Sequence, residues 1–140
     1  MGSKRHRQTK IDEPFVAIKR SVFGSLSALS PHACQVLMIL AGQYKGDNNG
    51  DLTLAFSVIS QNGGVCSKST LIRCKRELID AGLIYVTRKG HFPSTTELVA
   101  LTWFPLDVNP KFDPEALSGF TPKAYLNRQQ APPIKQFDST

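Results

Sequence analysis

"SKSTLIRCKRELIDAGLI", residues 67–84, combines apolar and basic side chains at the spacing of one amphipathic helix. At 100° per residue, an arc of about 80° contains four small or apolar residues, Leu71, Cys74, Leu78 and Ala81. An apolar arc of this kind is the face by which a surface helix packs on a core. The stretch therefore predicts a helix with one buried side and one side that carries basic residues.

Both ends of this helix are marked by residues that favour helix termini. Ser67 or Ser69 can serve as the N-cap, because a serine hydroxyl accepts a hydrogen bond from a free backbone N–H of the first turn. The apolar spacing ends at Asp80 or Ala81, and Gly82 can then adopt the left-handed conformation that ends many helices. We therefore expect the helix to stop at this glycine.

The face opposite the apolar arc carries hydrogen-bond donors that suit DNA. The centre of this face comprises Ser69, Ile72, Arg73 and Arg76. Lys68 and Lys75 lie on one flank of it, and Thr70 lies on the other. The major groove, about 12 Å wide, admits a helix, and an arginine there can donate two hydrogen bonds to guanine. The alternative is a face that meets only water, with its arginines paired to Glu77 or Asp80.

Two helices are predicted before this one. Ser30 can cap a helix with Pro31 in its first position, and small or apolar residues then recur every three or four positions, at Ala33, Val36, Leu37, Leu40, Ala41 and Tyr44. "LTLA", residues 52–55, favours a short strand, and "AFSVISQNGG", residues 55–64, favours a shorter helix that ends at two glycines. Residues 15–29 predict a short strand or a helical turn packed on the core.

Two strands are predicted after the basic helix. "LIYVTRK", residues 83–89, and "TELVALTWF", residues 96–104, have the alternating pattern of strands, and "GHFPST", residues 90–95, supplies a hairpin tip. The predicted order is helix, short strand, helix, turn, helix, strand, hairpin and strand. A short helix, a turn with glycine and a longer basic helix form a helix-turn-helix unit.

In this context "VCSKSTLIRCKRELIDAGLIYVTRKG", residues 65–90, resembles the winged helix-turn-helix pattern of bacterial regulators. The wider stretch of residues 15–107 is similar to small winged-helix proteins of bacterial chromosomes, plasmids and phages, whose relatives include domains of replication initiators. The resemblance implies an α+β fold, with a three-helix core and a C-terminal β-hairpin wing. It also implies that the third helix binds DNA.

The predicted DNA contacts come from the helix, the wing and the basic N-terminus. The helix contributes Ser67, Lys68, Ser69, Thr70, Arg73, Lys75 and Arg76, and the wing contributes Arg88, Lys89 and His91. Nonspecific contacts are predicted for Lys4, Arg5, Arg7 and Lys10. Lys75 stands where such helices usually carry an apolar residue, so we expect its stem to lie along apolar surface while its ammonium reaches a phosphate.

Charge and proline content divide the chain into three parts. The net charge is +6, and residues 1–20 and 65–91 each carry +4, as expected for a protein with a polyanionic partner. We predict a flexible basic arm over residues 1–14, a DNA-binding domain over residues 15–107, and a proline-rich tail over residues 108–140 that is partly disordered or forms short helices.

Other kinds of chemistry find little support in the sequence. No Cys-x-x-Cys pair and no zinc-ligand spacing occurs, so we expect neither a metal nor another cofactor. The three histidines have no nucleophile and carboxylate nearby in sequence, so we do not expect an enzyme. No apolar run is long enough to cross a membrane, and no secretory signal is recognisable, which predicts a protein of the bacterial cytoplasm.

The sequence thus predicts a sequence-specific protein that binds double-stranded DNA and regulates transcription. Two alternatives stay open: a plasmid or phage replication or partition factor that binds origin repeats, and a winged helix used as a protein-interaction module. We expect a homodimer, because helix-turn-helix proteins commonly bind two half-sites. Ile72 and Ile79 are apolar but lie off the apolar arc, which indicates a thymine methyl contact and a partner contact respectively, or simply local packing.

Overall fold

The computed structural model of the chain describes residues 12–63, 65, 67–91 and 95–129. Its elements, in chain order, are η2 (Arg20–Ala28), α1 (Pro31–Gln43), β1 (Leu52–Thr53), α2 (Phe56–Gln61), α3 (Lys68–Asp80), β2 (Ile84–Arg88), β3 (Leu98–Leu101), α4 (Ala116–Gly119) and η3 (Ala124–Arg128). The fold is therefore mixed α+β. Within residues 15–29, for which the sequence predicted a short strand or a helical turn, the structure has the 3-10 helix η2. No helix in these described ranges is long and apolar enough to cross a membrane.

The predicted signals at the helix ends are confirmed. At α1, the Ser30 Oγ accepts a hydrogen bond from the Ala33 N–H at 3.2 Å, and Pro31 is the first helical residue. At α3, Ser67 rather than Ser69 is the N-cap, because its Oγ accepts from the Thr70 N–H at 3.2 Å. Gly82 has φ +76°, so its left-handed conformation ends the helix.

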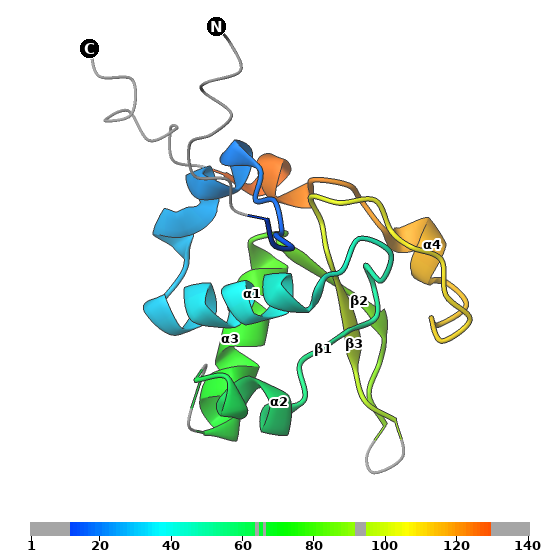
Figure 1. Ribbon diagram of the computed structural model, residues 1–140, viewed down its shortest axis with the longest axis horizontal. Helices are drawn as coiled ribbons and strands as arrows, with labels where there is room; N and C mark the ends of the chain where they lie inside the picture. The colour runs from blue at the N-terminus through cyan, green and yellow to red at the C-terminus, as the bar shows by residue number, and fades with distance from the viewer. Residues whose placement is uncertain (1–11, 64, 66, 92–94, 130–140) are drawn as a thin grey trace, which may run out of the picture.

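The three strands form one antiparallel sheet in the order β1–β3–β2. The end of β2 and the start of β3 extend away from α1 and α3 (Figure 1). The β2–β3 register shifts between Val86 and Arg88, which is a β-bulge. At the bulge Thr87 is buried, and its hydroxyl donates a hydrogen bond to the Gly50 carbonyl. Because a bulge bends a strand and increases its twist, it sets the direction in which the hairpin leaves the core.

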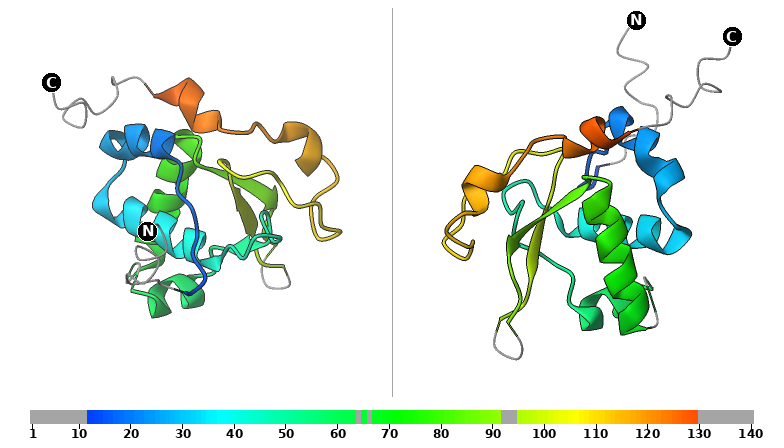
Figure 2. Two further views of the ribbon diagram at one scale, coloured as in Figure 1. Left: turned by 45° about the horizontal axis from the view of Figure 1, so that its top comes forward. Right: turned by 180° about the vertical axis from the view of Figure 1, so that it is seen from behind.

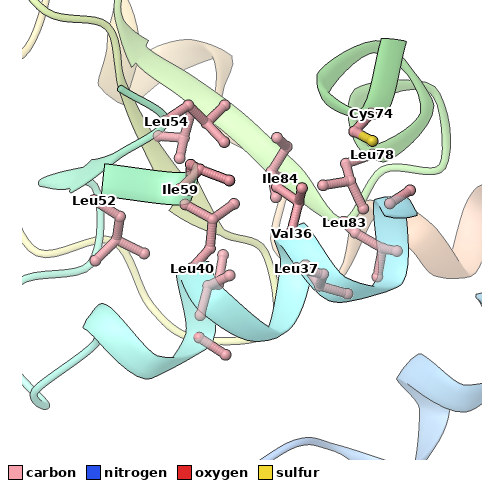
Figure 3. Close-up of a cluster of buried hydrophobic side chains, with 14 of the residues drawn as sticks. Val36, Leu37, Leu40, Leu52, Leu54, Ile59, Cys74, Leu78, Leu83 and Ile84 are labelled. Atoms are coloured by element: carbon pink, nitrogen blue, oxygen red, sulfur yellow. The ribbon is translucent and has the colours of Figure 1, made fainter. Parts of the chain in front are cut away.

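The core lies between α1, α3 and the sheet. Figure 3 shows Val36, Leu37 and Leu40 of α1 directed toward side chains from α2, α3 and the strands. On α3 the buried residues are Leu71, Cys74 and Leu78, and Ala81 is half-buried. The predicted apolar arc of the basic helix therefore does face the core, which leaves the opposite side of α3 outward.

The chain packs on this core well beyond residue 107, where the sequence predicted the domain to end. Tyr125 is fully buried in the main core, and its hydroxyl shares a 2.7 Å hydrogen bond with the Ser21 hydroxyl. The 3-10 helices η2 and η3 lie side by side at one end of the molecule (Figures 1 and 2). A Cβ on Gly82 would lie 2.7 Å from the Tyr125 backbone nitrogen, so glycine also permits this close approach.

Both edges of the sheet have hydrogen-bond partners outside the three strands. At β1, the Gln43 side chain accepts from the Thr53 N–H at 2.8 Å and donates to the Thr53 carbonyl at 3.0 Å, as a neighbouring strand would. Along β2, the Asp113 N–H donates to the Thr87 carbonyl at 2.8 Å, and the Asp113 carboxylate accepts from the Lys89 N–H at 2.9 Å. These contacts occupy part of each edge and leave fewer backbone groups for a further strand.

Candidate nucleic-acid interface

The outer face of α3, which comprises Lys68, Ser69, Ile72, Arg73 and Arg76, is exposed. Seen from behind the view of Figure 1, α3 stands in the foreground with no other element in front of it (Figure 2, right). Helical periodicity placed these five residues on the side opposite the apolar arc, with Lys68 on the flank of that outward face. The face therefore offers one hydroxyl, three cations and one apolar side chain to whatever approaches it.

Two of the basic residues on α3 have acidic partners within the chain. Lys75 donates to both carboxylate oxygens of Glu97, at 2.8 and 3.0 Å, and Arg73 lies 3.8 Å from the Glu77 carboxylate. Glu97 therefore competes with a DNA phosphate for the Lys75 ammonium. The sequence did not indicate this ion pair, because Glu97 is 22 residues from Lys75 and only the hairpin brings it to α3. Within the described ranges, Lys68 and Arg76 have no ion-pair partner.

Glu77 connects α3 with the start of α1. One carboxylate oxygen accepts from the Ser30 N–H at 2.7 Å, and the other accepts from the Ser30 hydroxyl at 2.9 Å. Burial raises the pKa of the Cys34 and Cys74 thiols, and the negative charge of Glu77 raises both further. The Glu77 carboxylate thus has a structural role, and it draws Arg73 toward the C-terminal half of α3.

The hydroxyl groups at the start of α3 are used unequally. Ser67 Oγ, the N-cap, also donates to Thr70 Oγ1 at 2.8 Å, so both hydroxyls take part in the local cap. Ser69 is exposed, and among the described residues its Oγ makes a single, longer contact of 3.3 Å with Ser67 Oγ. Of the three predicted hydroxyl contacts, Ser69 is the one that the cap leaves most accessible.

The hairpin brings three predicted contact residues together near its turn. Arg88 donates from Nε and Nη2 to the Thr96 carbonyl, at 2.9 and 2.7 Å, and so ties the two arms of the hairpin together. His91 and Thr95 exchange two backbone hydrogen bonds of 2.9 Å. The side chains of Lys89 and His91 are exposed. Arg88 thus supports the hairpin, whereas Lys89 presents its ammonium to solvent.

The start of α3 and the hairpin strands reach the same end of the molecule. In Figure 1 the start of α3 and the carboxyl-terminal end of β2 both lie toward the bottom, and η2 and η3 lie at the top. The first residue of α3, Lys68, therefore lies at the end of the fold toward which β2 leads, and Lys89 directly follows β2. The predicted arm contacts Lys4, Arg5, Arg7 and Lys10 lie outside the described residues.

Nothing in the described ranges provides a metal site, since no group of three or more His, Cys, Asp or Glu side chains lies together there. Comparisons of the chain with protein-family models, with curated proteins and with solved structures found no match. The case for a function therefore rests on the arrangement of the residues described above.

Proposed function

We propose that this chain is a winged helix-turn-helix protein that binds double-stranded DNA in a sequence-specific manner and regulates transcription. In this proposal α3 enters the major groove, and the β2–β3 hairpin is the wing that contacts the adjacent backbone. The order α1–β1–α2–α3–β2–β3, with β3 between the other strands, supports the winged-helix assignment. So does the resemblance of residues 65–90 to such domains.

The observation that carries the proposal is the outer face of α3. Its centre is exposed, and its cations Lys68 and Arg76 have no ion-pair partner in the described part of the chain. A helix with one buried face and such a basic opposite face is suited to a polyanion. Arg76 is the better candidate for reading a guanine, because the Arg73 guanidinium already lies near the Glu77 carboxylate in the unbound chain.

The homodimer stays a prediction, and the fold restricts how it could form. Gln43 covers the edge of β1, and the segment around Asp113 covers the edge of β2. These contacts disfavour a dimer in which one sheet continues across two chains. The expected location in the bacterial cytoplasm and the absence of an enzymatic activity also stay predictions.

A selection from a random duplex library, followed by affinity measurements at increasing salt, tests the proposal. Each neutralised phosphate contributes about −0.9 to the slope of log affinity against log salt. Arg73→Ala and Arg76→Ala should each relax the base preference at one position of the selected site. Lys89→Ala should weaken binding to all duplexes alike and make the salt slope shallower by about 0.9.

Matched controls come from the opposite end of the molecule. Arg20→Ala and Lys19→Ala remove the same charges from exposed positions at or beside the start of η2. They should leave the selected sequence unchanged and alter the salt slope less than Lys89→Ala does. If micromolar protein shifted no random duplex at low salt, the proposal would be wrong, and a protein-interaction module would become the better interpretation.

A further inference from the structure

Ile72 is an unexplained apolar residue at the centre of a basic surface. The residue is 58% exposed, although α3 offers the core an apolar face of its own. Ile79, the other isoleucine off the predicted arc, is half-buried and packs against the core, which accounts for it as local packing. Ile72 is absent from that core, so its exposed surface is available to a partner.

The neighbours of Ile72 define what could cover it. Lys68 and Arg76 lie four residues before and after it, the spacing that places side chains on one face of a helix. Both are exposed cations without an ion-pair partner in the described ranges. An apolar protein surface would have to bury these charges, whereas DNA would place phosphates near them. Charge complementarity therefore favours a nucleic-acid partner for this face.

The base edges of the major groove include one apolar group, the 5-methyl of thymine. Isoleucine is branched at Cβ and in a helix occupies one strongly preferred χ1 rotamer, so its methyl groups point in a defined direction. A rigid apolar side chain between two cations can thus meet a thymine methyl while the cations meet phosphates or guanine. A methyl group buried in such a contact is worth about a fourfold change in affinity.

Resting on the proposed function, we infer that Ile72 is a specificity-determining residue that contacts the 5-methyl group of one thymine in the major groove. The recognised sequence then contains thymine at a fixed position next to the bases that the arginines read. This requirement goes beyond DNA binding as such, since phosphate contacts carry no sequence information.

Replacing thymine by deoxyuridine removes only the methyl group and so tests this contact directly. In a duplex selected from a random library, each thymine is replaced in turn, and the affinities of the wild-type chain and of Ile72→Ala are measured. At one thymine of the selected site, the replacement should weaken wild-type binding about fourfold and leave Ile72→Ala binding unchanged. Ile72→Val should give an intermediate loss.

Leu117→Ala is the matched control, because Leu117 is 54% exposed but lies on α4. It should respond to deoxyuridine as the wild-type chain does. The inference fails if the selected site has no fixed thymine, or if every replacement affects wild type and Ile72→Ala equally. It also fails if Ile72→Ala changes only self-association. Sequence-specific binding in those cases would leave the proposed function intact, whereas failure to bind any duplex would overturn the function itself.

Discussion

Two polar regions of the molecule, the turn around Asn49 and the outer face of α3, use their hydrogen-bonding groups in opposite ways. Asn49 is fully buried, and its Nδ2 donates to the carbonyls of Leu101, Phe104 and Pro105 at 2.9 to 3.2 Å. Its Oδ1 accepts from the Leu101 N–H at 2.8 Å. On α3, by contrast, Lys68 and Arg76 have no ion-pair partner within the described residues.

The difference separates residues that hold the fold from residues that are available to a partner. A buried amide without hydrogen bonds would cost stability, so Asn49 is useful only because every side-chain group is satisfied. Exposed cations are hydrated by water and cost the fold little when left unpaired. Substitutions in the first region should therefore change stability, and substitutions in the second should change binding.

The largest expected effect on stability is that of Asn49. Asn49→Ala should lower the free energy of unfolding by about 3 kcal/mol or more, because it leaves the buried Leu101 N–H without its acceptor. Asn49→Asp should cost more at neutral pH, since a carboxylate oxygen would then face three carbonyl oxygens. Urea denaturation followed by circular dichroism measures both changes.

The adjacent Asn48 is the matched comparison. It is half-buried, its Oδ1 accepts from the Lys45 N–H, and its Nδ2 donates to the Gln43 carbonyl. Asn48→Ala should cost about 1 kcal/mol, because water can replace part of what is lost. Equal costs at the two positions would contradict the assignment of Asn49 as the buried centre of this turn.

An intermediate effect is expected for Glu77, which connects α1 with α3. Glu77→Gln should lower the free energy of unfolding by about 1 to 2 kcal/mol, because an amide can accept only one of the two hydrogen bonds from Ser30. It should also lower the pKa of the Cys34 thiol, since the Glu77 charge is the second cause, after burial, that raises it.

Urea denaturation measures the stability change, and the pH dependence of Cys34 alkylation, read by peptide mass mapping, measures the thiol. A destabilised chain with an unchanged Cys34 profile would show that Glu77 acts on α1 without influencing the thiol electrostatically. An unchanged stability would contradict the role of the Ser30 contacts.

The smallest effect on stability is expected for the ion pair of Lys75 and Glu97, whose side chains are 33% and 23% exposed. Glu97→Gln should change the free energy of unfolding by less than about 1 kcal/mol. If α3 binds DNA, the freed ammonium can reach a phosphate. Affinity at low salt should then rise, and the slope of log affinity against log salt should steepen by about 0.9.

Asp51→Asn is the control for this experiment, because it frees Lys111, which lies on neither α3 nor the hairpin. It should leave the salt slope of DNA binding unchanged. An identical response to both substitutions would indicate a general effect of net charge rather than a contact made by Lys75.

Much of the helical part of the fold was predictable because its signals are local. The Ser30–Pro31 start, the Ser67 cap and the stop at Gly82 all act within a few residues of the helix ends. The spacing of Leu71, Cys74 and Leu78 correctly indicated the buried side of α3. No local signal indicated the role of Asn49, because its partners around Leu101 lie more than 50 residues away.

The sequence by itself determined which face of the basic helix turns outward, since helical periodicity and caps are properties of neighbouring residues. Only the tertiary structure decided that the Lys75 ammonium is engaged by a carboxylate, because folding of the hairpin brings Glu97 to Lys75. Packing of α1 on α3 likewise brings Ser30 to Glu77, whereas the contact of Arg73 with Glu77 is a local i,i+4 pair that the sequence already allowed. The tertiary structure also decided that residues after 107 join the core, because Tyr125 reaches the core from a distant, proline-rich segment. Such contacts depend on distances across the folded chain, which no local pattern records.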